Sequence, residues 1–302
     1  MTLVEPTIDA ISDALRAAGF ASNVAEIALE PSDGRVLVRL GEDRMAWFPL
    51  DEDGRAGMER ERRVLRLIAA HCSFRAPRVL HEDRRGWDLR AIVPGVSRPF
   101  APRTRLKTDR GLAQRTGTAI GLILADQHTN IPPDGLEGCL PPAPNWPRAE
   151  DIPRLPEVTG DTRLLARIER ALARAAEAAR DRRNPVLAHT DVALHNIAFD
   201  PVTDDVAGVF DYEGAAFTDR CHDFKYLILD EPREPLLEAA LAAYEPLTGV
   251  AVDRGRIRLL HAASAIAFLA YRAGRAPEEP WCGRTLAEDL SWTSAALTAA
   301  QL

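Results

Sequence analysis

Lysine is nearly absent from this chain of 302 residues, in which Lys107 and Lys225 are the only two. Positive charge is therefore carried almost entirely by arginine, a side chain that stays protonated near neutral pH. The formal net charge is -7, which argues against general binding to nucleic acid or to an anionic membrane surface. We therefore expect neither a nucleic-acid nor a membrane partner. A negative net charge favours a cationic small molecule over an anionic polymer as the partner.

Cysteine and long apolar runs are also scarce. The four cysteines are scattered without a C-x-x-C pair, which argues against a zinc site and a disulfide framework. No apolar run approaches the length of a bilayer span, and the N-terminal residues lack the basic start and apolar block of a secretory signal. We expect a cytoplasmic protein, whose 46% of hydrophobic residues suffices for one large or two smaller domains.

The first third of the chain mixes helix and strand patterns. Helical periodicity marks residues 7–19 and 55–71. Strand-like runs separated by turn residues predict an antiparallel sheet from residues 25–29, 35–40, 44–50, 76–81 and 87–93. Glu61 falls inside the apolar stripe of the second helix, where a carboxylate needs a cationic partner. Pro94 and Gly95 end the last strand and mark a hinge.

Beyond the hinge the pattern becomes mainly helical. Helical periodicity covers residues 107–128, 161–183, 234–246, 253–274 and 284–300. The sequence therefore predicts an α+β protein of two lobes. A small N-lobe with an antiparallel sheet and a helix occupies residues 1–93, and a larger, mainly helical C-lobe occupies residues 94–302.

Residues 189–211 are the most informative stretch of the C-lobe. Asp191 and Asn196 lie five residues apart in a tight loop, and two short apolar runs around a turn follow, at 197–199 and 206–210. These runs predict a β-hairpin, which brings Asp211 back beside the start of the motif. One carboxylate can then orient or deprotonate a hydroxyl, while an amide oxygen and a second carboxylate hold Mg2+ on nucleotide phosphates.

Six short motifs in the right order resemble the aminoglycoside phosphotransferase and choline-kinase group of the protein-kinase-like fold. The likeness extends over about residues 25 to 270. In the central part of the chain, residues 189–196 are similar to the family pattern H-G-D-x-x-x-x-N, residues 210–213 to I-D-W-E, and residues 223–225 to D-L-A. Upstream, residues 124–128 are similar to L-A-x-x-H, residues 61–65 to E-x-x-x-L, and residues 94–95 to P-G.

The resemblance implies a role for each residue of the central motif. Asp191 would orient the substrate hydroxyl and accept its proton. Asn196 and Asp211 would be the Mg2+ ligands. His189 and Asp223 would brace the catalytic loop from behind without touching substrate.

The resemblance also implies the substrates. ATP or GTP would donate the γ-phosphoryl group, with its base hydrogen-bonded to the hinge backbone near Ala91 and Val93. The acceptor would be a hydroxylated small molecule, as in the antibiotic-modifying branch of the family. The protein would therefore be a small-molecule O-phosphotransferase that serves antibiotic resistance or natural-product biosynthesis.

Two departures concern the N-lobe. The third strand of this fold normally carries a lysine that pairs with the helix glutamate and contacts phosphates, but Trp47 or a neighbour falls at that position. Either an arginine such as Arg39 or Arg44 replaces it and pairs with Glu61, or Mg2+ carries more of the neutralisation, or the nucleotide site is degenerate. Strand alternation favours Arg39 as a cleft residue and leaves Arg44 facing water.

The second departure is the expected phosphate loop at residues 30–34, which has one glycine and two acids and would repel phosphate. Together the departures leave two alternatives to an active kinase. One is a pseudokinase that binds a nucleotide or another ligand, and the other is the same fold used for a different reaction.

Overall fold

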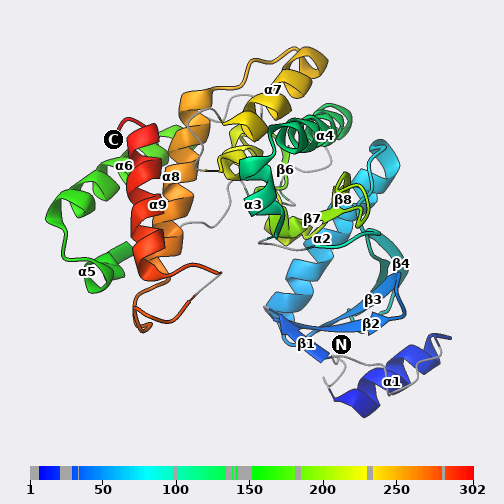
Figure 1. Ribbon diagram of the computed structural model, residues 1–302. Helices are drawn as coiled ribbons and strands as arrows, with labels where there is room; N and C mark the ends of the chain where they lie inside the picture. The colour runs from blue at the N-terminus through cyan, green and yellow to red at the C-terminus, as the bar shows by residue number, and fades with distance from the viewer. Residues whose placement is uncertain are drawn as a thin grey trace. The chain divides into compact units, whose positions relative to one another are not determined.

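The computed structural model describes residues 7–20, 29–32, 34–97, 101–133, 138, 140–141, 152–180, 185–229, 234–280 and 283–302. The chain divides into two compact units (Figure 1). Unit 1 comprises Met1–Ser97 and Asn196–Glu213, and unit 2 comprises Arg98–His195 and Gly214–Leu302. The predicted boundary after residue 93 thus differs from this division, which also assigns the hairpin of the central motif to unit 1.

An antiparallel sheet forms the centre of unit 1. Its strand order is β1-β2-β3-β5-β4, from β1 (Leu29–Ser32), β2 (Arg35–Leu40), β3 (Arg44–Pro49), β4 (Arg78–Glu82) and β5 (Asp88–Ala91). The last four strands confirm the prediction. The first was misplaced: residues 21–28 lie outside the described part, and the strand runs through Pro31, which pairs with Val36. Proline is tolerated because β1 is an edge strand, so most of the expected phosphate loop is strand.

Strand alternation gives the sheet two different faces. The even-numbered residues Val36 and Val38 of β2 join a core with α1 (Ile8–Ala17), whose residues Ile11 and Leu15 are fully buried. The odd-numbered residues therefore point to the opposite face. Helix α2 (Glu52–His71) packs against β3 and β4.

The hairpin predicted within the central motif is present in unit 1. Strands β7 (Ile197–Phe199) and β8 (Val206–Val209) pair antiparallel. The hairpin is joined to the hinge segment, because Val96 and Phe199 exchange backbone hydrogen bonds of 2.9 Å. Gly95 permits this approach: its φ is +126°, and a Cβ there would lie 2.7 Å from the Phe199 carbonyl oxygen.

Unit 2 is mainly helical, as the sequence predicts. Its described helices are α3 (Ala101–Thr108), α4 (Arg110–Asn130), α5 (Leu155–Val158), α6 (Thr162–Arg180), α7 (Pro235–Thr248), α8 (Arg254–Ala270) and α9 (Leu286–Ala299). Helices α4 and α7 approach closely, because a Cβ on Gly117 or Gly121 would meet the backbone of α7 at 2.3 or 2.2 Å. None of the described helices is long and apolar enough to cross a membrane.

One strand pair of unit 2 was not predicted. Strands β6 (Val186–Ala188) and β9 (Ala216–Thr218) are three residues each and pair antiparallel. Runs this short do not show strand periodicity. They matter because β6 leads directly into His189 and β9 precedes Asp223, so the pair holds together the segments that lead to these two motif residues.

Candidate active site

The backbone of the catalytic loop in unit 2 is held in an unusual conformation. Thr190 has a φ of +69°, which is a genuine outlier for a β-branched residue. Its hydroxyl donates a hydrogen bond of 2.7 Å to the carbonyl of Gly214, and its N–H donates one of 2.6 Å to the Asp223 carboxylate. These bonds hold the strained residue in place, where the related families have glycine. Strain maintained in this way is typical of a functional loop.

Asp223 braces the loop from behind, as the resemblance implies. Its fully buried carboxylate accepts hydrogen bonds from the backbone N–H groups of His189 and Thr190 and lies 2.9 Å from Nε2 of His128. His128 is fixed in turn, because its Nδ1 lies 2.9 Å from the Tyr244 hydroxyl. Burial alone would raise the pKa of Asp223, but His128 and these N–H donors hold it below its ordinary value.

Asp191 follows the braced segment and remains accessible, with 40% of its side chain exposed. The Nε2 atom of His195 lies 3.4 Å from its Oδ2. Burial raises the pKa of Asp191, but the hydrogen bond from His195 and the positive charge around the loop outweigh it and hold the pKa below the ordinary value. Asp191 is thus an ionised, positioned hydrogen-bond acceptor at neutral pH.

Asn196 and Asp211 lie at the two ends of the hairpin in unit 1. The Phe210 N–H donates a 3.0 Å hydrogen bond to the Asn196 carbonyl, which brings the two ends side by side. Asp211 has a φ of +68°, and its side chain is 41% exposed. An amide oxygen and a carboxylate at adjacent positions are hard donors of the kind Mg2+ prefers. The residues therefore fit this ion.

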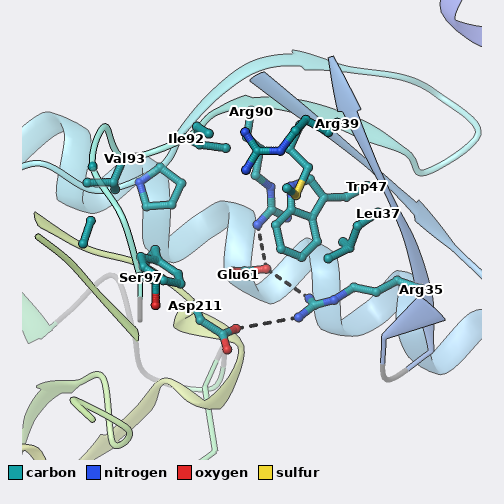
Figure 2. A pocket seen from close by; sticks show the side chains of 15 residues that line it. Arg35, Leu37, Arg39, Trp47, Glu61, Arg90, Ile92, Val93, Ser97 and Asp211 are labelled. Atoms are coloured by element: carbon teal, nitrogen blue, oxygen red, sulfur yellow. Dashed lines mark hydrogen bonds and ion pairs between the residues drawn. The ribbon is translucent and has the colours of Figure 1, made fainter. Parts of the chain in front are cut away.

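The partners of Glu61 differ from those predicted. Its buried carboxylate pairs with Arg90 at 2.7 Å and with Arg35 at 3.4 Å, as Figure 2 shows, and not with Arg39 or Arg44. Burial alone would raise the pKa of Glu61, but the two guanidinium groups hold it below its ordinary value.

The expectation failed because both true partners occupy buried positions. Arg35 and Arg90 are buried, whereas Arg39 and Arg44 are exposed. One signal was available in the sequence: Arg35 lies four residues from Arg39 on the same strand and therefore on the same face. Nothing local in the sequence marks Arg90.

Trp47 lies on β3, the strand on which we expected the lysine of the related enzymes. The guanidinium carbons of Arg35 and Arg90 lie 4.5 and 4.6 Å from the centroid of its ring. These are cation–π contacts. The strand position thus lacks a cation of its own but holds two neighbouring cations in place.

Arg35 also reaches the hairpin. Its Nη2 atom lies 2.5 Å from Glu213 and 3.7 Å from Oδ1 of Asp211, as the dashed line to Asp211 in Figure 2 shows. A single buried guanidinium thus connects the helix carboxylate Glu61 with the candidate metal ligand Asp211. Arg35 is a candidate site residue that our sequence reasoning missed.

These side chains line a cavity of about 290 Å³ in unit 1. Arg39 and Val93 line it, as do Arg35, Trp47 and Asp211 (Figure 2). Ala91 instead lines a separate cavity, with Ile68, Cys72 and Pro94. The structure therefore brings a hinge residue, three arginines and a candidate metal ligand together, and it leaves Ala91 outside this group.

The profile of the phosphotransferase enzyme family matches residues 16–260. No curated protein sequence matches the chain. Solved structures similar to the chain include the GDP complex of an aminoglycoside 2'-phosphotransferase-IIIa mutant, with a TM-score of 0.65, 15% sequence identity, and coverage of 97% of this chain and 96% of that one. The macrolide 2'-phosphotransferase MphH from Brachybacterium faecium has a TM-score of 0.64 and 17% identity, with coverage of 97% of this chain and 98% of that one. The streptomycin-ATP complex of APH(2'')-IIa has a TM-score of 0.63 and 15% identity, with coverage of 98% of this chain and 99% of that one.

The structural likeness, at these low identities, establishes the protein-kinase-like α+β fold. The family profile covers most of the chain. The chain therefore belongs to the phosphotransferase enzyme family and is a phosphotransferase that acts on a hydroxyl group.

Proposed function

We propose that the protein transfers the γ-phosphoryl group of ATP or GTP to a hydroxyl of a small molecule, with Asp191 as the residue that orients the hydroxyl and accepts its proton. The observation that carries this proposal is the braced loop, in which Asp223 fixes the backbone before Asp191 and leaves an ionised carboxylate accessible. A positioned acceptor of this kind is what general-base assistance requires.

The cavity in unit 1 suits the nucleotide. Val93 lies at the hinge, where the nucleobase would bind, and Arg39 and Arg35 supply positive charge for the phosphates. Asn196 and Asp211 would hold Mg2+, which neutralises phosphate charge when it is bound. The nucleotide complexes among the similar structures, with GDP, ADP and ATP, support this reading.

A cationic antibiotic is the acceptor we favour. Similar structures include complexes with kanamycin, streptomycin and gentamicin. The net charge of -7 favours a positively charged partner. The corresponding role is antibiotic resistance, or tailoring of a natural product during its biosynthesis.

The test is a transfer assay with the purified protein. ATP and GTP, each with Mg2+, are incubated with kanamycin, gentamicin, streptomycin, a macrolide, choline and homoserine, and 31P NMR with mass spectrometry follows the phosphoryl group. We expect a phosphorylated acceptor with the wild type and none above background with Asp191→Asn. Failure of all acceptors, together with absent Mg2+-dependent nucleotide binding by calorimetry, would contradict the proposal.

One observation favours a second candidate, a nucleotide-binding protein without transfer. Trp47 or a neighbour occupies the strand position expected to carry the phosphate-contacting lysine, and Arg35 is already paired with Glu213. This candidate predicts tight nucleotide binding by calorimetry without turnover of either nucleoside triphosphate, so the same assay separates the two.

A further inference from the structure

One of the two lysines of the chain lies in the interior beside the catalytic loop. Lys225 begins the short helix η7 (Lys225–Leu227), two residues after Asp223, and is only 4% exposed. Its carbonyl oxygen accepts a 2.7 Å hydrogen bond from Nδ1 of His261, and Trp292 donates to the other ring nitrogen. The backbone that carries Lys225 is therefore held on both sides, by the loop brace and by α8.

The ammonium of Lys225 has little direct compensation. In the described part of unit 2 it makes a cation–π contact with Tyr226, at 4.8 Å from the ring centroid, and no direct ion pair. Burial is the largest influence and lowers the pKa of Lys225 to about 8, although the carboxylates of Asp191 and Asp223 favour the charged form. The group is therefore mostly protonated at neutral pH and lies within the electrostatic reach of Asp191.

A buried ammonium without an ion pair destabilises the folded state. This chain uses arginine almost everywhere else, so a lysine here is not explained by general composition. Lysine differs from arginine in being a compact point charge that shifts its pKa when buried. A charge that is kept beside a functional loop although it destabilises the fold indicates that it interacts with a ligand.

We propose that the Lys225 ammonium contacts the phosphoryl group while it is transferred to the hydroxyl held by Asp191. This inference rests on the proposed function and adds a catalytic residue to it. The bond between the acceptor oxygen and the γ-phosphorus forms, and the bond from that phosphorus to the nucleoside diphosphate oxygen breaks. The hydroxyl proton passes to Asp191, and Lys225 keeps its own proton throughout.

The chemistry of the acceptor explains why a cation near Asp191 is well placed. The hydroxyl oxygen that donates its hydrogen bond to Asp191 becomes the bridging oxygen of the new phosphoester. The phosphoryl group therefore arrives at the atom next to Asp191, with negative charge spread over its three other oxygens. A fixed ammonium in this region stabilises that charge without reorganising.

The small number of lysines makes a direct test possible. Protein labelled with 13C at the lysine ε-carbon gives two NMR signals, and Lys107→Arg removes one of them and assigns the other to Lys225. Mg-ADP, Mg-GDP and the non-hydrolysable triphosphate analogues of both nucleotides are then added separately. We expect the Lys225 signal to move with a triphosphate analogue and to stay unchanged with its diphosphate.

The outcomes separate the two proposals. Nucleotide binding by calorimetry with an unmoved Lys225 signal, or an equal shift with the diphosphate, overturns the role of Lys225 alone. Absence of any nucleotide binding overturns the proposed function and this inference with it.

A kinetic arm uses matched variants of the two lysines. Lys225→Met keeps the length of the side chain and removes its charge, and Lys107→Met is the control at an exposed position. We expect kcat for the acceptor identified in the transfer assay, or for nucleoside triphosphate hydrolysis, to fall roughly 100-fold with Lys225→Met, while KM values change by no more than a few fold. Lys225→Arg should restore part of the loss, and a kcat within about threefold of wild type for Lys225→Met would overturn the proposal.

Discussion

The contacts of the buried Arg35 with Glu61 and Asp211 lead to a specific prediction about nucleotide affinity. Arg35→Ala should weaken Mg-nucleotide binding more than Arg39→Ala, and Arg39→Ala more than Arg44→Ala. Arg35 has 5% of its side chain exposed and lies 3.7 Å from Asp211 at the cavity. Arg39 lines the same cavity but is exposed, and Arg44 is not among its lining residues.

The magnitude follows from the environment of each group. A charge-assisted hydrogen bond contributes about 1.5–3 kcal/mol when it is desolvated. That range corresponds to a loss of about 10- to 150-fold in Kd for Arg35→Ala. The exposed Arg39 is screened by solvent, so its contact should contribute at most about 1 kcal/mol, or roughly fivefold.

Folding must be separated from binding in this test. Glu61 keeps Arg90 at 2.7 Å after Arg35→Ala, so its carboxylate is not left without a cation. We therefore expect a folded variant with a lower Tm, measured by calorimetry, alongside titration of Mg-ATP and Mg-GTP by isothermal calorimetry. Arg35→Lys retains the charge and should recover part of the affinity. Unchanged affinity in a folded Arg35→Ala variant, or a larger loss with Arg39→Ala, would refute this reasoning.

Four further predictions concern side chains of the candidate site. Asp191→Asn and Asp191→Ala should each preserve folding and lower phosphoryl transfer by roughly 100-fold or more, because both remove the proton acceptor; activity within a few fold of wild type would exclude that role. Because the pKa of Asp191 is depressed, wild-type kcat should be lost only as pH falls below the ordinary carboxyl range near about 4. Asp211→Ala should abolish the Mg2+ dependence of nucleotide binding in calorimetry, and an unchanged dependence would place the ion elsewhere. Lys225→Met should be more stable than wild type at pH 7 in urea unfolding, by on the order of 3 kcal/mol for a shift from 10.5 to about 8. The difference in unfolding free energy between variant and wild type should shrink as pH rises from about 8 toward 10.5, because the unfolded wild type then binds more protons than the folded wild type. A variant less stable than wild type at pH 7 would contradict a lowered pKa of Lys225.

Local pattern alone determined much of this protein. The periodicity of α1, α2 and α6 could be recognised because each of these helices buries one stripe of its own residues. The hairpin from residue 197 to 209 could also be predicted from the sequence, because its turn and both strands are contiguous. Its pairing also predicted that Asn196 and Asp211 lie at neighbouring ends, which follows from strand geometry without reference to the rest of the fold.

Tertiary structure decided the partners of the buried charges. Glu61 needed a cation, and the chain offers many arginines, but only the folded structure places Arg35 of β2 and Arg90 of β5 within reach of its carboxylate. These partners lie 26 and 29 residues away in sequence, and no local preference distinguishes them from Arg39 or Arg44. The same holds for Asp223, whose bonds to the loop before Asp191 span 33 and 34 residues. Helix and strand periodicity depends on residues that are close in the sequence. The choice of a partner for a buried charge depends instead on which faces meet when the whole unit folds.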